Sequence, residues 1–224
     1  MPDNEPEPRA LGPHVLLRIW LPDRPGALGL VASRIGAVRG DIVGIDVLER
    51  GTDVAVDEFA VELENLDLLP VLVREIEEVD GASIEEVRVV ESFPDPRLDA
   101  LESATRLCEA TDVAALQDIL VSHTRREFLA DWSALVDGDE LLAAAGDVHP
   151  DPSMLQALAA GTTASPRVAD GTTGPADLAV ARLRSHEATL LLGRDGHPFR
   201  RRERAQLLAL ARVADRAWEL LKPL

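Results

Sequence analysis

The segment Asp23-Arg24-Pro25-Gly26 carries the residues whose types and spacing are best suited to binding a ligand. It follows an apolar run at 14–21 and precedes a helical apolar pattern, so Pro25 and Gly26 predict a tight turn from a strand into a helix, here called the elbow. Free N–H groups at a helix start can bind a carboxylate, while the Asp23 carboxylate can bind an ammonium group. The elbow could therefore hold both ends of an amino acid.

Other residue types that could do chemistry lack the spacing that catalysis or metal binding requires. The histidines, at positions 14, 123, 149, 186 and 197, show no metal-ligand pattern and no cysteine pair accompanies them, so we expect no metal site. Neither the Gly-x-Ser-x-Gly nor the Gly-x-x-x-x-Gly-Lys motif occurs. We therefore expect no catalytic residue and no cofactor. The single cysteine, Cys108, is predicted to pack in the core on the side of a helix that carries Leu101.

The charge balance limits the classes of partner. Forty acidic and 23 basic residues give a net charge of −17, which would repel a phosphate backbone, so direct nucleic-acid binding is not expected. The chain has a concentrated basic run from Arg200 to Arg204. We interpret it as the charged first turn of a helix, in preference to a surface that contacts an acidic partner or a second copy of the chain. The first thirteen residues hold no apolar signal segment and no run reaches membrane-spanning length, so we expect a cytoplasmic protein without membrane contact.

The elements that must position the elbow follow from hydrophobic periodicity in the first part of the 224-residue chain. A strand at 14–21 and a helix at 27–38 are predicted, with Gly40 closing the helix. A hairpin follows, formed by a strand at 41–49, a turn at 51–53 and a run with Phe59, Val61 and Leu63. A helix with Leu72 and Ile76 and a last strand with Val87 and Val89 complete the order βαββαβ. This order predicts a ferredoxin-like sandwich of four strands covered on one side by two helices.

The βαββαβ order, the elbow motif and Gly40-Asp41-Ile42 at the second strand together resemble the ACT domain family over residues 13–92. The resemblance implies a small-molecule sensor, usually for amino acids, that pairs so that ligands lie between two copies. Carried over by position, it places Asp23 and Gly26 in the first loop and Asp41 at the start of the second strand, where the family often has Asn. The predicted ligand-binding residues are Asp23, Arg24, Gly26, Ala27, Leu28, Asp41 and Ile42. Turn chemistry alone would also favour Asp at 23 and 41.

Prolines at 94 and 96 predict a linker at 93–97. The linker divides a first domain at 13–92 from a second domain at 98–224. A flexible N-terminus at 1–12 is expected before the first domain. In the second domain we expect helices around 98–109 and 113–127, with Thr111 and Asp112 as candidate caps. The remaining predicted elements are an apolar segment at 128–136, a turn at 137–139, a return strand at 140–145, a mobile loop at 161–177, a strand pair at 178–183 and 188–192, and a last helix with a stripe from Leu207 to Leu221.

The second domain resembles a shortened GAF domain, a sensor fold with an antiparallel sheet flanked by helices. The likeness lies in the helical entry at 98–127, in Asp131-Trp132-Ser133-Ala134-Leu135 with its Asp-Gly turn, and in His197-Pro198-Phe199 before the closing helix. No ligand residues are carried over from this resemblance. The fold class expected for the whole chain is α+β.

These features favour a non-enzymatic regulatory protein, a homodimer that binds a small metabolite, an amino acid, between its first domains. The alternative is a regulatory interaction module that docks on a separate enzyme or transcription factor. A third class, a small enzyme, would require His186, His197 and the Gly-Thr loop to meet in one pocket.

Overall fold

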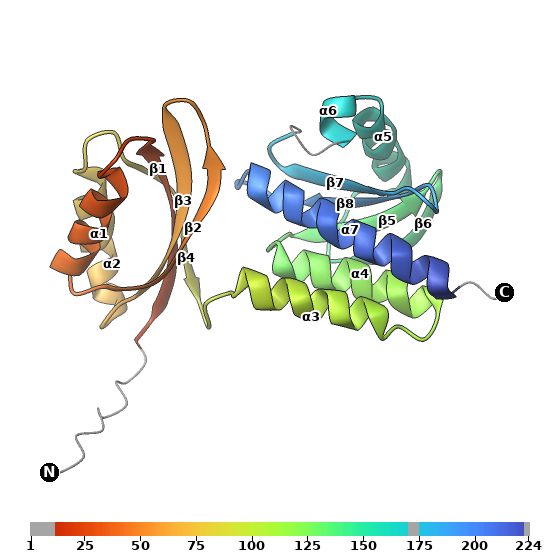
Figure 1. Ribbon diagram of the computed structural model, residues 1–224, viewed down its shortest axis with the longest axis horizontal. Helices are drawn as coiled ribbons and strands as arrows, with labels where there is room; N and C mark the ends of the chain where they lie inside the picture. Colours follow the sequence, from red (N-terminus) through yellow and green to blue (C-terminus); the bar gives the residue numbers. More distant parts are fainter. Residues whose placement is uncertain (1–11, 170–174, 222–224) are drawn as a thin grey trace, which may run out of the picture. The chain divides into compact units, whose positions relative to one another are not determined.

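The computed structural model describes residues 12–169 and 175–221 and divides into two compact units, Met1–Phe93 and Pro94–Leu224. Most of the predicted flexible N-terminus, residues 1–11, lies outside the described residues, as do residues 170–174 of the predicted loop. Each unit contains one four-stranded antiparallel sheet with helices packed against it (Figure 1). The predicted α+β class is therefore confirmed.

The first unit is a ferredoxin-like sandwich. Its elements are β1 (His14–Pro22), α1 (Ala27–Ala37), β2 (Asp41–Arg50), β3 (Val54–Glu62), the 3₁₀ turn η1 (Leu66–Leu68), α2 (Leu69–Glu77) and β4 (Ser83–Val90). The strand order is β2-β3-β1-β4, and α1 and α2 cover one face of the sheet (Figure 1). The predicted βαββαβ order is confirmed.

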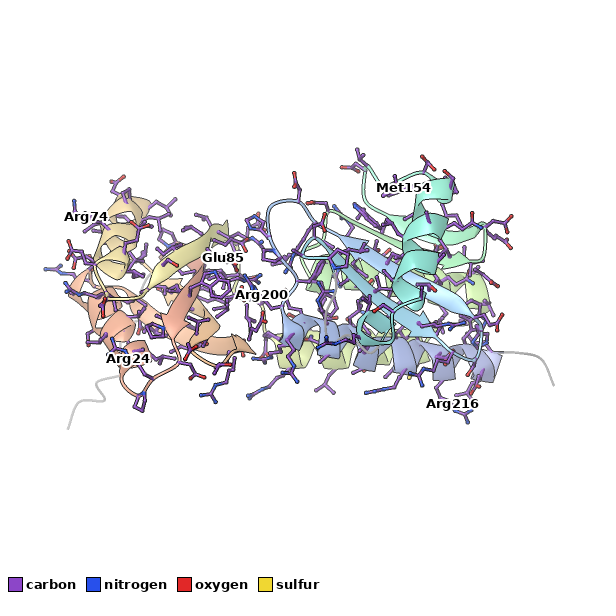
Figure 2. All side chains as sticks on the ribbon, turned by 90° about the horizontal axis from the view of Figure 1, so that it is seen from above. Arg24, Arg74, Glu85, Met154, Arg200 and Arg216 are labelled. Atoms are coloured by element: carbon purple, nitrogen blue, oxygen red, sulfur yellow. The ribbon has the colours of Figure 1, made fainter. Side chains whose placement is uncertain are left out.

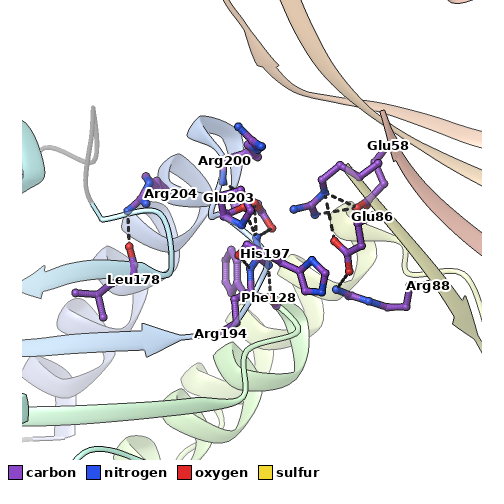
Figure 3. Close-up of polar contacts among 12 residues, drawn as sticks. Glu58, Glu86, Arg88, Phe128, Leu178, Arg194, His197, Arg200, Glu203 and Arg204 are labelled. Carbon is purple, nitrogen blue, oxygen red and sulfur yellow. Dashed lines mark hydrogen bonds and ion pairs between the residues drawn. The ribbon is translucent and has the colours of Figure 1, made fainter. Parts of the chain in front are cut away.

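Every second side chain along the central strands points toward the helices, and the apolar ones among these side chains form the core of this unit. Leu17 and Ile19 of β1 and Phe59 of β3 are fully buried on the face that meets the helices, where Val31 and Ile35 of α1 pack against them. The opposite face carries charge, because Arg18 lies between Glu58 of β3 and Glu86 of β4. Its Nη2 is 2.9 Å from Glu58 Oε2, and Arg88 also contacts Glu86 (Figure 3). One face of the sheet is therefore the apolar core against the helices, and the other carries a group of paired charges among apolar residues such as Leu16 and Val56.

Gly40 takes part in the end of α1, as predicted, but it is not the left-handed residue there. That conformation belongs to Arg39, whose φ is 61°. The Arg39 N–H donates to Gly36 O at 3.0 Å and the Gly40 N–H donates to Ile35 O at 3.0 Å, a Schellman motif. Gly40 has a different role, because a Cβ there would lie 2.9 Å from Ile35 Cγ2. Glycine at 40 permits close packing of the helix end against the next strand.

The second unit has helices on both faces of its sheet. Its elements are α3 (Pro96–Cys108), α4 (Val113–Glu127), β5 (Trp132–Asp137), β6 (Glu140–Ala145), α5 (Pro152–Thr163), α6 (Pro166–Ala169), β7 (Leu178–Leu183), β8 (Ala188–Gly193) and α7 (Arg201–Leu221). The strand order is β6-β5-β8-β7, with α4 and α7 on one face, α3 packed on them, and α5 and α6 on the other face (Figure 1).

Strand alternation gives this unit two cores. Leu190 and Leu192 of β8 face α4 and α7, and Leu207 of α7 belongs to the same core. Leu191 of β8 faces the other way, where Leu155 of α5 closes a smaller core. The predicted stripe on the last helix is confirmed, since its members from Leu207 to Trp218 are buried. Asp112 caps α4 as predicted, accepting the Ala115 N–H at 2.9 Å.

Three local predictions in this unit were wrong. Pro96, assigned to the linker, is the first residue of α3, because Asp95 caps that helix by accepting the N–H groups of Arg97 and Leu98. Part of the predicted loop at 161–177 is helical, in α5 and α6. The predicted apolar segment at 128–136 is not one element, because Phe128 caps the C-terminus of α4, Leu129 takes a φ of 50°, and β5 begins only at Trp132.

The predicted burial of Cys108 was also wrong, because this cysteine is exposed. Leu101 shares its side of α3 and is 67% exposed. The helix turns a different side toward α4 and α7, burying Ser103 and Leu107. Among the described residues, no helix offers an apolar stretch of membrane-spanning length.

Candidate functional site

The elbow joins β1 to α1 through a left-handed glycine. Gly26 is the N-cap of α1 with a φ of 92°, and no side chain caps the helix. The turn is fixed by its own backbone, since the Arg24 N–H donates to Pro22 O at 2.8 Å and the Asp23 N–H donates to Asp53 O at 2.9 Å. The start of α1 is thus held in place without a side-chain acceptor. The Ala27 N–H donates to Arg24 O at 3.3 Å, and the next N–H groups, those of Leu28 and Gly29, can meet an anion.

Asp23 has a cationic partner within the chain. Its Oδ1 accepts a hydrogen bond from Arg50 Nη2 at 3.0 Å, and the side chains are 25% and 70% exposed. Arg50 is the last residue of β2, which brings the end of that strand beside the elbow. A ligand ammonium that reached Asp23 would compete with a mostly solvated arginine, an exchange that costs little because exposed ion pairs are weak.

Asp57 is the residue at this site that the sequence did not identify. It lies on β3 opposite Ile19, is 4% exposed, and its Oδ1 receives no hydrogen bond from the described residues. Burial raises the pKa of Asp57, the positive charge of Arg50 lowers it, and the negative charge of Asp23 raises it again, with a net increase. Asp57 therefore belongs to one electrostatic cluster with Asp23 and Arg50, here called the elbow cluster. A signal was available, because Asp57 shares the strand period of Phe59 and Val61 and is thus the one charge on a core-facing stripe.

The other predicted residues around the elbow have different surroundings. Arg24 extends from the elbow (Figure 2), and its Nη2 is 3.6 Å from Asp80 Oδ2, with both side chains exposed. Ala27 is buried at the start of α1, whereas Leu28 is 37% exposed. Leu28 is thus the apolar side chain at this turn that a ligand could contact.

The structure does not bring Asp41 and Ile42 to the elbow of the same chain. Asp41 pairs with Glu62, which in turn pairs with His14, whereas the elbow follows Pro22 at the other end of β1. Eight residue steps of a strand span roughly 26 Å. Asp41 is exposed, and Ile42 packs at the margin of the core. A ligand that touched both Asp23 and Asp41 would have to lie between two copies of the chain.

His186 and His197, which the enzyme hypothesis requires to meet in one pocket, are placed apart by the structure, whereas residues 170–174 of the Gly-Thr loop lie outside the described residues. His186 precedes β8 and His197 follows it, so they lie toward opposite ends of that strand. His186 stacks on Trp218, with ring centroids 4.3 Å apart, and its Nδ1 is 3.0 Å from Asp215 Oδ1. These contacts give His186 a role in packing α7.

The basic run at the start of α7 has a structural role, as expected for a charged first helical turn. Glu203 accepts the Arg200 N–H at 2.7 Å, which is half of a capping box. Arg204 is 7% exposed and donates to the carbonyl oxygen of Leu178 at 2.7 Å (Figure 3). It also donates to the carbonyl oxygen of Pro175 at 2.6 Å. This arginine ties the segment that enters β7 to the last helix.

The second unit also contains a cavity of about 640 Å³ to which the sequence assigned no ligand residue. It lies where β5 begins and β8 ends, beside α5 and the segments that follow β6 and precede β7. Its lining is Asp131, Trp132, Val148, His149, Pro150, Leu158, Pro175, Asp177, Leu178, Gly193, Arg194 and Asp195.

No family model matches the chain, and no curated protein matches it. Among solved structures, it is similar to the ACT domain of a GTP pyrophosphokinase from Chlorobium tepidum, with 17% identity and a TM-score of 0.29, over 37% of this chain and 90% of that one. It is also similar to a bacteriophytochrome from the photosynthetic bacterium R. palustris, with 14% identity and a TM-score of 0.34, over 66% of this chain. The chain spans only 34% of that bacteriophytochrome. TM-scores this low do not assign the chain to a family.

Proposed function

We propose that this chain is a non-enzymatic regulatory protein that binds a small metabolite, an amino acid, at the elbow between two copies of itself. The observation that carries the proposal is the elbow cluster, in which the buried Asp57 Oδ1 receives no hydrogen bond from the described residues. A buried carboxylate without a donor is unfavourable, and a ligand ammonium would supply the missing donor. The uncapped start of α1 would take the ligand carboxylate.

The regulatory step follows from charge. Without ligand, the Asp23 and Asp57 carboxylates repel each other, and Arg50 offsets part of that repulsion. A bound ammonium would offset it further and would favour the arrangement of two copies that encloses the ligand. Ligand must bind one arrangement better than another for any equilibrium to shift. The second unit would then transmit or complete the response.

The test is a thermal-unfolding screen of the full chain against the twenty amino acids, followed by calorimetric titration of each hit. Ligand at about 100 times its dissociation constant stabilises a protein by roughly 2.7 kcal/mol. We expect Asp57→Asn to abolish the response, because the amide keeps the shape of the carboxylate without its charge. Gly26→Val should also abolish it, since valine strains a left-handed φ and moves the helix start.

Matched controls lie close by. Asp53→Asn changes an exposed acid in the neighbouring turn while its backbone oxygen still accepts the Asp23 N–H, and Gly29→Val adds a side chain where open space surrounds the glycine. Both controls should respond like the wild type. Unchanged calorimetric binding in Asp41→Asn would remove Asp41 from the site, and a response that survives Asp57→Asn would contradict the elbow as the site.

A second candidate function is the interaction module that docks on a separate enzyme or transcription factor. It is favoured by an apolar groove of about 550 Å³ between α3 and α7, whose lining includes Leu107, Val213 and Leu220. Leu220 is 70% exposed. A stable co-purifying enzyme or transcription factor that is lost in Leu220→Lys and kept in Glu219→Gln, together with no response to any amino acid, would favour this function.

A further inference from the structure

The cavity of the second unit has a predominantly apolar wall. Leu158 of α5, Leu178 at the start of β7, and Val148 and Pro150 after β6 supply aliphatic surface. A volume of about 640 Å³ lies within the range typical of small-molecule sites. The cavity can therefore bury the apolar body of a metabolite-sized molecule.

Trp132 gives this wall an aromatic surface, and Gly193 sets its position. The two residues pair across β5 and β8, and a Cβ at 193 would collide with the indole ring of Trp132. The glycine thus allows the indole to lie across the end of β8. Trp132 remains partly exposed, so its ring can contact a ligand cation.

Three carboxylates at the cavity lining carry negative charge. Asp131, Asp177 and Asp195 all contribute to the lining, and all are exposed. Their backbone groups are used locally, because the Asp195 N–H donates to Asp131 Oδ2 at 2.7 Å and the Arg194 N–H donates to Asp177 O at 3.1 Å. The side chains of Asp177 and Asp195 can therefore be changed without removing these hydrogen bonds.

Arg194, which also lines the cavity, has its guanidinium committed elsewhere (Figure 3). It donates to Phe128 O and His197 O at 2.8 Å each and to Pro198 O and Glu203 Oε2 at 2.9 Å each. It also stacks over Phe199, 4.0 Å from the ring centroid, and is 4% exposed. Each of these contacts would have to break before Arg194 could bind a ligand phosphate or carboxylate.

His149 adds an imidazole ring to the lining. Its Nδ1 lies 2.9 Å from Pro150 O, a contact that places the proton on Nδ1. In the neutral ring, Nε2 is then a lone-pair acceptor. The groups left to meet a ligand are thus an aromatic face, carboxylates and an imidazole ring.

We propose that this cavity is a second binding site, separate from the elbow, and that it takes an organic cation with an apolar body, such as an aromatic or aliphatic amine. The apolar body packs on Leu158 and Leu178, and the ammonium group lies toward Trp132 and the carboxylates of Asp177 and Asp195. Phosphate-bearing ligands are disfavoured, because the lining presents negative charge without an available guanidinium.

The test uses two probes that share one body and differ in charge, tryptamine and indole-3-propionate. Each is titrated calorimetrically into the full chain and into three variants. The double variant Asp177→Asn, Asp195→Asn removes two carboxylates. Leu158→Trp fills the cavity, and its control Met154→Trp lies one turn earlier on α5 (Figure 2), at a position 52% exposed. Asp139→Asn is the charge control, at the β5–β6 turn at the other end of β5.

We expect tryptamine to bind and indole-3-propionate to bind at least about tenfold more weakly, because each exposed ammonium–carboxylate pair contributes a factor of a few. The double variant should weaken tryptamine about tenfold, Leu158→Trp should abolish binding, and Met154→Trp and Asp139→Asn should match the wild type. Equal or tighter binding of indole-3-propionate would overturn the cation preference. If neither probe bound the wild type, the proposed second site would be overturned. The proposed function would not be affected, because it is tested by the amino-acid response that depends on Asp57.

Discussion

At the scale of single residues, Arg39 holds a left-handed backbone conformation that arginine adopts at a cost. Its φ of 61° ends α1, and its exposed guanidinium lies 3.9 Å from the Glu64 carboxylate. We expect Arg39→Gly to raise the free energy of unfolding by about 0.5 kcal/mol, since glycine relieves the strain but gains entropy when unfolded. Urea denaturation measures this change. Arg39→Ala keeps the strain and should not stabilise; a loss of stability in Arg39→Gly would contradict the account.

Arg204 shows how a residue that looks like surface charge in the sequence can be structural. Replacing it with Met should remove the guanidinium hydrogen bonds to the carbonyl oxygens of Leu178 and Pro175 and lower the free energy of unfolding by about 2 to 3 kcal/mol. Arg216→Met is the control on the same helix (Figure 2), because its partner Glu219 is also exposed and such pairs contribute less than about 1 kcal/mol. If the two variants lost similar free energies of unfolding, the buried hydrogen bonds of Arg204 would contribute no more to stability than an exposed ion pair does.

At the scale of elements, Glu127 joins three helices of the second unit. It ends α4 and accepts hydrogen bonds from Ser103 of α3 at 2.9 Å and from Gln206 of α7 at 2.6 Å. Burial raises the pKa of Glu127, and the two hydrogen bonds only partly offset that rise. The folded state therefore holds this proton to higher pH than the unfolded state does, so the contribution of Glu127 to stability decreases as the pH rises through the raised pKa.

The variant Glu127→Gln removes this titration. We expect it to be more stable than the wild type at pH 7, and we expect the difference to shrink as the pH falls toward 4.5, the ordinary value for glutamate. Urea unfolding of both proteins across this range measures the difference directly, because the other titrating groups cancel. A variant less stable than the wild type at pH 7 would show that the carboxylate stabilises the helix layer.

Elements with strong periodicity were predictable from the sequence, and those held by local chemistry were not. The strands of the first unit and the stripe of α7 follow alternating or helical apolar patterns, and the structure confirms them. Helix α5 was missed because no element was assigned to 152–160 and its last residues, 161–163, were placed in a loop, although Asp151 and Pro152 form a cap signal before Leu155. Cys108 was misplaced because one apolar side of α3 faces outward. Asp57 was missed because its burial depends on pairing between distant strands.

At the scale of the whole molecule, the elbow proposal requires two copies, and the first sheet offers two edges for pairing, β2 and β4. The β2 edge exposes more large apolar side chains, with Val43 56%, Ile45 38% and Val47 42% exposed. We expect the wild type to be a dimer and Ile45→Lys to be a monomer in sedimentation velocity, because charge on an edge opposes pairing. Val89→Lys, on the β4 edge, should remain a dimer. Dissociation of Val89→Lys alone would move the interface to β4.

The central claim is that the elbow cluster binds an amino acid. The measurement that tests it most directly is calorimetric titration of the screen's best amino acid into the wild type, Asp57→Asn and Asp53→Asn. The account predicts binding to the wild type and to Asp53→Asn, and none to Asp57→Asn. Binding to Asp57→Asn with unchanged affinity, or no binding to the wild type by any of the twenty, would contradict it.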